Sequence, residues 1–268
     1  MKFKEGDFVT RRSYDSDIIF KIEKIYSQKA ILRGCRLRLL VEVPLNDLLK
    51  MDSQPEEMEK TLFREANQYL KRRQRNIILN NFRGNNNNPG SKIIRKKPGS
   101  VLHIDGDKNY LKMSLQNYSN LQIPAVGFHV PEKEQPAIIR QYLESYHPDI
   151  LVITGHDGLI DKGKHNVSEH FIRTVKNSRK VNSSLDELII FAGACFSPCK
   201  KLLEEGANFA SSPQNQLLHF LDPVLIVDKI AYTSIKEVVS IEDILKITIT
   251  EEGVGGLETR GKMRLCYP

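Results

Sequence analysis

Cysteine is scarce in this chain of 268 residues, which contains only four of them. So few cysteines exclude a small secreted scaffold held together by disulfides. They fit a reducing compartment, where a single cysteine is either a packed apolar group or a reactive thiol. Each one is therefore judged by its surroundings in the sequence, and the four are Cys35, Cys195, Cys199 and Cys266.

Long apolar runs are also absent, because no window approaches the roughly 18 consecutive apolar residues of a membrane span. The amino terminus turns charged at Lys2, Lys4 and Glu5, so it lacks the apolar segment of a secretory signal. We therefore expect a cytoplasmic location and no membrane partner. With 40% hydrophobic residues, the chain can still bury one sizeable core and a small second domain.

Acidic residues are missing from one stretch, residues 71–100. The whole chain has 40 Lys and Arg against 33 Asp and Glu, a net charge of +7 at pH 7. Without this stretch, 31 basic residues face 33 acidic ones, a net charge of −2. The basic excess suggests a polyanion partner, but it belongs to one segment. Its nine basic residues are Lys71, Arg72, Arg73, Arg75, Arg83, Lys92, Arg95, Lys96 and Lys97.

The first two parts of the chain differ in pattern. Residues 1–52 contain short β-rich runs separated by Gly and Asp turn signals, which predicts a small SH3-like β-barrel. Residues 53–98 predict a helix from Pro55 toward Leu79, followed by a flexible, basic, Asn-rich linker. The expected strands of the barrel are 8–9, 18–22, 30–32 and 37–43.

Residues 99–268 form a third part with an α/β pattern. Compact apolar runs, typical of strands covered on both faces, alternate with amphipathic helical patterns. This alternation predicts a mostly parallel sheet flanked by helices. The expected strands are 101–105, 123–128, 150–154 and 188–192, with 224–227 and 247–250 as extensions, and the expected helices are 134–146, 168–180 and 198–205.

Two consecutive strands of this sheet end in Gly-rich turns that carry a histidine and a cysteine. His156 follows the strand at 150–154, and Cys195, 39 residues later, follows the strand at 188–192. Ligands bind at the carboxyl ends of parallel strands, so we expect the imidazole and the thiol to meet there. A histidine can generate the nucleophilic thiolate and then protonate a leaving amine. The pattern predicts a cysteine nucleophile with a histidine base, which needs no cofactor.

The two strand ends resemble those of the caspase-like (clan CD) cysteine peptidases, where apolar runs end in His-Gly and Ala-Cys. Asp157, inserted between His156 and Gly158, departs from that pattern. The resemblance implies a caspase-like fold for residues 99–268. It also implies an oxyanion hole in which the backbone N–H of Cys195 is joined by that of either Asp157 or Gly158.

The resemblance further implies a specificity pocket charged by a residue at the end of the first strand. An acid there would pair with the guanidinium of a substrate arginine. Asp105 is our first candidate and Asp107 the second, although both acids can equally be turn formers. Asp222 is a weaker rival in a later loop.

Four segments together resemble the YabG family of sporulation-specific peptidases of endospore-forming bacteria. They are residues 3–14, 98–107, 154–158 and 193–198, and the resemblance covers most of the chain. It implies a protease of sporulation, located in the mother cell or at the spore coat. Its expected substrates are spore coat or spore-associated proteins, which it would cut after basic residues and above all after arginine.

An arginine-selective protease would find cleavage sites in its own linker. Basic residues in exposed, flexible backbone are readily cut. We therefore expect self-cleavage within residues 71–100, with Arg75, Arg83 and Arg95 as the candidate sites.

A nucleic-acid-binding protein is the alternative from another functional class. The small barrel and the basic segment could grip phosphates, with a steep dependence on salt. The segment has one aromatic residue, Phe82, so it offers little stacking for unpaired bases. The motifs of P-loop, Rossmann and serine-hydrolase enzymes are absent from the sequence.

The cysteines and a metal site have competing interpretations. Cys195 could be a small apolar core residue at a strand end, and the other three cysteines are interpreted as structural.

The loop that begins at Asp105 imitates half of an EF-hand, but it has Tyr110 where Gly is needed and Gln116 where Glu is expected. Nothing in the spacing favours zinc ligation by His156, His165, Cys195 and Cys199. No metal is therefore expected.

Overall fold

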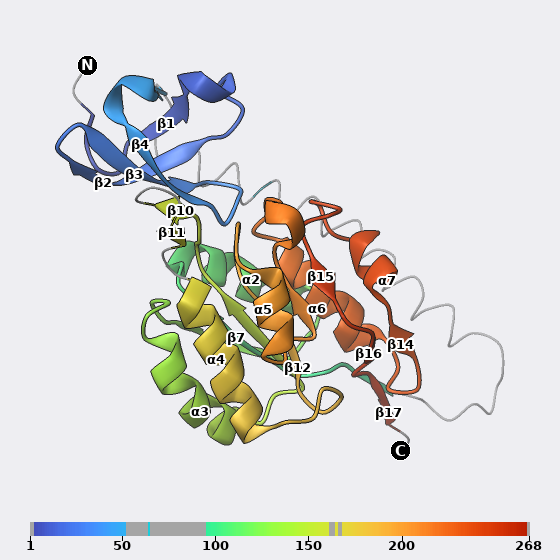
Figure 1. Cartoon of the computed structure of the whole chain (residues 1–268). Helices are drawn as coiled ribbons and strands as arrows, with labels where there is room; N and C mark the ends of the chain where they lie inside the picture. The colour runs from blue at the N-terminus through green and yellow to red at the C-terminus, as the bar shows by residue number, and fades with distance from the viewer. Residues whose placement is uncertain (1–2, 52–63, 65–94, 161–163, 166–167, 267–268) are drawn as a thin grey trace.

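The computed structural model describes residues 3–51, 64, 95–160, 164–165 and 168–266. The amino-terminal strands stand at one end of an α/β part that contains the larger sheet (Figure 1). The predicted helix from Pro55 toward Leu79 falls almost wholly outside the described residues. The predicted boundaries near residues 52 and 98 stay predictions.

The amino-terminal strands form one antiparallel sheet with the order β4-β3-β2-β1-β5. Every predicted strand of this part is present, and a fifth is added, but a closed SH3-like barrel is not confirmed. Alternate side chains of β3 are buried, as expected for a sheet with one covered face. The strands are β1 (Phe8–Arg11), β2 (Phe20–Tyr26), β3 (Lys29–Gly34), β4 (Leu40–Pro44) and β5 (Leu48–Lys50), with 3₁₀ turns at Arg12–Tyr14 and Leu45–Asp47.

The larger sheet has six strands in the order β15-β13-β12-β9-β7-β8. All neighbours pair in parallel except β15, which runs antiparallel to β13. The predicted mostly parallel sheet flanked by helices is confirmed, whereas its finer caspase-like character stays a prediction. The strands are β7 (Val101–Asp105), β8 (Ala125–His129), β9 (Ile150–Thr154), β12 (Ile189–Ala192), β13 (Phe209–Ala210) and β15 (Gly255–Gly256).

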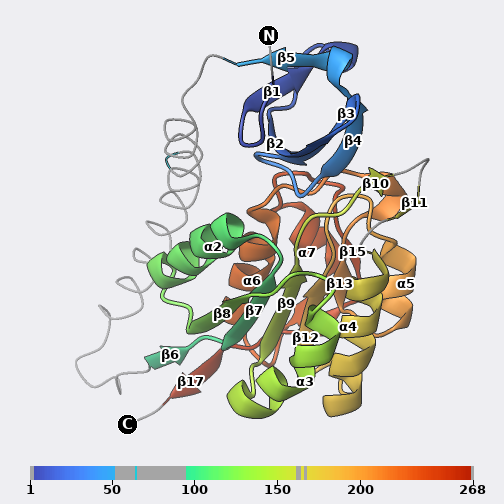
Figure 2. The same cartoon turned by 90° about the vertical axis from the view of Figure 1, so that its left-hand side faces the viewer.

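Helices cover both faces of this sheet, because alternate strand residues point into two different apolar clusters (Figure 2). One cluster holds α2 and α6 and continues into the amino-terminal sheet, so the two sheets share a core. The other cluster holds α3, α4 and α5. The helices are α2 (Lys108–Asn120), α3 (Gln135–Tyr146), α4 (Ser168–Val181), α5 (Cys199–Glu204), α6 (Asp222–Tyr232) and α7 (Ile241–Leu245).

Two predicted strands are wrong. Residues 224–227 lie inside α6, which is buried on nearly all sides. A short run that is apolar all round cannot be told from a buried strand by its periodicity. Residues 247–250 form a turn after α7, where the backbone N–H of Ile249 donates to Asp222 at 2.6 Å.

Short ladders complete the fold. Arg95–Lys97 (β6) pairs with Arg264–Cys266 (β17), Leu159–Ile160 (β10) with Lys164–His165 (β11), and Val238–Val239 (β14) with Thr259–Arg260 (β16). A 3₁₀ turn spans Pro213–Asn215. In the part of the chain that the structure covers, we find no helix long and apolar enough to span a membrane.

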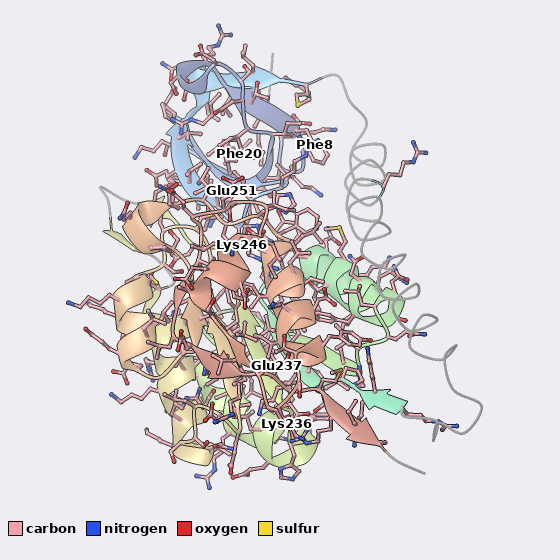
Figure 3. The ribbon with its side chains drawn as sticks, turned by 90° about the vertical axis from the view of Figure 1, so that its right-hand side faces the viewer. Phe8, Phe20, Lys236, Glu237, Lys246 and Glu251 are labelled. Atoms are coloured by element: carbon pink, nitrogen blue, oxygen red, sulfur yellow. The ribbon has the colours of Figure 1, made fainter. Side chains whose placement is uncertain are left out.

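The predicted strand 37–43 begins only at Leu40. Residues 36–39, the docked segment, leave the amino-terminal sheet and make isolated bridges to His219 and Asp157 of the α/β part. The loop with Lys246 and Glu251 lies at the end of the α/β part that faces the amino-terminal sheet, whereas Lys236 and Glu237 lie toward the far end (Figure 3). The bridge to Asp157 places the docked segment next to the turn that carries His156.

Candidate active site

His156 and Cys195 follow two strands that pair directly. β9 and β12 are parallel neighbours, with Ile153 opposite Ala192, so both turns leave the same edge of the sheet. Both side chains are buried, with exposed fractions of 2% for His156 and 0% for Cys195. The turns that carry the two predicted residues are thus neighbours, and neither residue faces solvent.

The inserted Asp157 connects the two turns. Its Oδ1 accepts the backbone N–H of Gly158 at 2.8 Å, and its Oδ2 accepts the hydroxyl of Ser197 at 3.0 Å. Ser168 of α4 donates to the same Oδ2. The sequence offered Asp157 as a departure from a pattern and its backbone N–H as a candidate for the oxyanion hole. The structure shows in addition that its side chain links the histidine turn to the cysteine turn.

The docked segment lies across these turns as an extended peptide. The N–H of Arg38 donates to the carbonyl of Leu218 at 3.0 Å, and the N–H of Phe220 donates to the carbonyl of Arg36 at 3.0 Å. Beyond Arg38, the N–H of Leu40 donates to the carbonyl of Asp157 at 2.9 Å. Main-chain pairing of this kind is how extended peptides are held by β-strand addition.

The carbonyl oxygen of Arg38 accepts two backbone hydrogen bonds. One comes from the N–H of Cys195 at 3.1 Å and the other from the N–H of Asp157 at 3.3 Å. These are two of the three N–H groups predicted for the oxyanion hole. The third, that of Gly158, is bound to the Asp157 side chain instead. A peptide carbonyl therefore occupies the position predicted for the oxygen of a scissile bond.

The side chain of Arg38 is completely buried and ends at Asp105. One terminal nitrogen donates a hydrogen bond to a carboxylate oxygen of Asp105 at 3.2 Å, and the other lies 2.9 Å from the second oxygen in an ion pair. Burial by itself raises the pKa of Asp105, but the charges and hydrogen bonds of Arg38 and His103 together outweigh it and hold that pKa well below its usual range. The first candidate acid thus binds an arginine, and the arginine comes from the same chain.

Aromatic rings and carbonyls complete the surroundings of the guanidinium. The carbon atom at its centre lies 5.1 Å from the centroid of the Tyr110 ring. Tyr110 also stacks with Phe220 and with His156, at centroid distances of 5.0 and 5.1 Å. The carbonyls of Gly155 and Phe220 accept weak hydrogen bonds from Arg38 at 3.4 and 3.5 Å. Tyr110 therefore borders both the bound arginine and the histidine.

Asp107, the second candidate acid, lies beside the histidine. One of its carboxylate oxygens is 3.7 Å from Nδ1 of His156, and the same oxygen is 2.9 Å from the guanidinium of Arg33. The other oxygen caps α2 by accepting the backbone N–H groups of Asn109 and Tyr110. Its position next to the imidazole suits an orienting carboxylate better than a second acid in the arginine pocket.

The thiol and the imidazole are both uncharged in this arrangement. Burial lowers the pKa of His156 to about 3 and raises the pKa of Cys195 to about 12. The sulfur accepts the N–H of Leu218 at 3.1 Å, and neither ring nitrogen of His156 finds a hydrogen-bond partner among the described residues. Both side chains are therefore shielded from water.

Thiol alkylation tests this shielding. At pH 8, a thiol with a pKa of about 12 has a thiolate fraction about 1,000-fold below that of an ordinary cysteine. We expect iodoacetamide to modify the exposed Cys266 at an ordinary rate and Cys195 at least about 1,000-fold more slowly in the intact chain. Peptide-resolved mass spectrometry measures both rates in one sample, and equal rates would contradict the buried arrangement.

A cavity lies next to Asp107 and Tyr110. This cavity of about 600 Å³ separates the amino-terminal sheet from the start of α2. Asp107 and Tyr110 line it, but His156 and Cys195 do not. The docked segment, rather than this cavity, lies against the backbone N–H groups of Cys195 and Asp157.

The remaining candidates lie elsewhere. Asp222 is at the start of α6, where it accepts hydrogen bonds from the turn at residues 249–250, so its contacts suit a structural role. The thiol of Cys199 donates to the carbonyl of Ala210 at 3.4 Å. His165 belongs to β11. Within the described ranges, no three His, Cys, Asp or Glu side chains are arranged to hold a metal.

The described residues include only one of the three predicted self-cleavage sites. Arg75 and Arg83 lie outside the described residues. Arg95 is exposed, but it belongs to β6 and pairs with Cys266 of β17, so its backbone is not the open loop that was expected. The nucleic-acid-binding alternative depends on the same basic segment and stays a prediction.

Sequence reasoning missed Arg38, Tyr110 and the stretch at residues 218–220. Arg38 looks like the polar position of an alternating strand, with Leu37 and Leu39 on either side. No local signal separates it from the other basic residues of that sheet. Residues 217–221 are mostly apolar, a pattern that could have indicated another buried segment.

Comparison with known proteins places these residues in context. A family model described as YabG peptidase U57 matches residues 4–268. The chain is 38% identical over 292 residues to a Bacillus subtilis (strain 168) protein named "Sporulation-specific protease YabG". That match covers 100% of this chain and 99% of the relative.

Proposed function

The chain belongs to the YabG peptidase family, and from that premise we propose that it is a cysteine endopeptidase of sporulation that cuts after arginine. The observation that carries the proposal is the position of Arg38. Its carbonyl accepts the N–H groups of Cys195 and Asp157 while its guanidinium pairs with Asp105. One residue thus makes at once the contacts expected of an arginine before a scissile bond.

The proposed roles follow from these contacts. Cys195 attacks the carbonyl carbon, and His156 takes the thiol proton and passes it to the leaving nitrogen. The N–H groups of Cys195 and Asp157 stabilise the charge that develops on the oxygen. Water then releases the acyl group from the sulfur. Asp107 is a positioning residue, because its carboxylate lies 3.7 Å from Nδ1 of His156 and favours the charged imidazole that forms during transfer.

The pocket chemistry favours arginine over other side chains. Asp105 is fully buried, so a substrate that leaves its charge unpaired loses much of the binding free energy. The planar guanidinium fits both carboxylate oxygens and lies against Tyr110, whereas the ammonium of lysine offers a point charge. We therefore assign selectivity for arginine to Asp105 and Tyr110.

Three matched peptides test this assignment. They differ only before the scissile bond, where they carry Arg, Lys or Gln. We expect kcat/KM for the Arg peptide to exceed that for Lys by at least about 10-fold and that for Gln by at least about 1,000-fold. Activity should disappear once peptide-resolved mass spectrometry shows that Cys195 itself is alkylated. Equal rates on the three peptides, or activity that survives alkylation of Cys195, would contradict the proposal.

The biological setting follows from the named relative. The Bacillus subtilis protein is called a sporulation-specific protease. We assign this chain to the same process, in the mother cell or at the spore coat, with spore coat or spore-associated proteins as substrates. Cleavage of extracted coat proteins by the purified chain, with new carboxyl-terminal arginines found by mass spectrometry, tests the substrate class.

A further inference from the structure

We propose that the docked segment, residues 36–39, is an internal substrate whose Arg38–Leu39 bond is cut by Cys195 of the same chain, and that the uncut segment keeps other substrates out. This inference rests on the proposed function and adds its own site and regulation. The predicted cleavage within residues 71–100 is a separate event.

The first support is the register of the segment. Residues before Arg38 pair antiparallel with residues 218–220, and Leu40 pairs with Asp157. Main-chain contacts therefore hold the chain on both sides of the Arg38–Leu39 bond, as they would hold a peptide substrate across its scissile bond. A segment that only linked two domains would need no such pairing on both sides.

The second support is the carbonyl of Arg38. A buried salt bridge between Arg38 and Asp105 could by itself fasten the amino-terminal sheet to the α/β part. That structural role does not require the Arg38 carbonyl to accept the N–H of Cys195 at 3.1 Å and that of Asp157 at 3.3 Å. Both hydrogen bonds polarise the carbonyl of Arg38, which favours attack on its carbon by the thiol of Cys195.

The third support comes from two glycines that make room for the segment. A Cβ atom on Gly158 would lie 1.7 Å from the carbonyl oxygen of Leu40, and one on Gly34 would lie 2.6 Å from that of Leu37. No side chain can be accommodated at either position without moving backbone. Glycine at these two positions therefore lets the backbone approach closely before and after the Arg38–Leu39 bond.

The reaction needs only water besides the chain itself. The thiol proton of Cys195 moves to His156 as sulfur bonds to the carbonyl carbon of Arg38. The carbon–nitrogen bond then breaks, and His156 protonates the amino group of Leu39. Water adds to the thioester and restores the thiol, which leaves a carboxylate on Arg38. The products are residues 1–38 and 39–268.

The cut also explains how activity would be released. Before cleavage, the segment is tethered beside the thiol, so it competes with outside peptides at a high effective concentration. After cleavage, the new carboxylate of Arg38 is no longer connected to Leu39 and can leave the pocket. Leu40 and Val41 of β4 still pair with Arg33 and Leu32 of β3, so the ladder holds both fragments together.

The full-length purified chain provides the test. We expect amino-terminal sequencing and intact-mass analysis to show a new terminus at Leu39 during incubation, with a first-order rate that does not change on dilution. Hydrolysis of an added Arg peptide should show a lag with the same rate constant. Cys195→Ala should show no new terminus. A chain that stays intact at this bond while it cuts the Arg peptide without a lag would overturn the inference and leave the proposed function standing.

Two arginine variants provide a matched pair. Arg38→Gln should slow cleavage at this bond at least 100-fold. Arg36→Gln removes an exposed side chain two residues away, so the chain should still be cleaved after Arg38. Circular dichroism checks that both fold. If Arg38→Gln fails to fold, the new terminus at Leu39 and the lag of the wild-type chain still test the inference. Failure of the wild type to cut either the Arg peptide or itself would remove the proposed function and this inference together.

Discussion

Cys195→Ala is expected to lower kcat/KM for an Arg peptide at least about 1,000-fold, because the variant has no atom that can form the acyl-enzyme. The stability cost should be small by comparison, since the change removes one buried sulfur atom and costs about 1 kcal/mol of unfolding free energy. Steady-state kinetics and thermal unfolding on the same preparation measure both effects.

Cys199→Ala is the matched control for this prediction. Cys199 is another buried cysteine of the same region, and its thiol donates to the carbonyl of Ala210. We expect a similar loss of stability and nearly full activity. If the two alanine variants lose activity to the same extent, or if Cys195→Ala stays active, another group is the nucleophile.

Asp105→Asn is expected to lower kcat/KM for the Arg peptide at least about 1,000-fold, with a much smaller effect on the Gln peptide. Asparagine keeps the shape of the side chain but not its charge, so a bound guanidinium would be buried without a counter-ion. The ratio of kcat/KM for Arg to that for Gln is the measurement, because it does not depend on the amount of folded enzyme.

The same substitution also leaves Arg38 unpaired in the intact chain, which costs about 3 to 5 kcal/mol of unfolding free energy. The double variant Asp105→Asn with Arg38→Gln removes both charges, so it should recover much of that stability without recovering selectivity for arginine. Asp222→Asn is the control, since it changes a buried aspartate whose contacts are with residues 219 and 249–250. An unchanged Arg to Gln ratio in Asp105→Asn would rule out Asp105 as the pocket acid.

The strands that position the site could be predicted because their signal is local. The runs at 101–105, 150–154 and 188–192 are short, apolar and followed by Gly-rich turns, and they are present as β7, β9 and β12. The run at 224–227 has the same apolar character but belongs to a helix. Its burial on nearly all sides comes from the shared core of the two sheets, which no window of sequence contains.

The sequence by itself determined the α/β pattern and the two strand ends that carry His156 and Cys195, because short-range periodicity and spacing encode these features. The resemblance of four segments to a known family pointed to the family. Only the tertiary structure decided what occupies the site. Arg38 meets Asp105, Gly155 and Phe220 across separations of 67, 117 and 182 residues. Contacts over such distances depend on how the amino-terminal sheet packs against the α/β part. A charged residue in an exposed-looking strand therefore becomes the most completely enclosed arginine of the described structure, since burial there is stabilised by a carboxylate that comes from the other part of the chain.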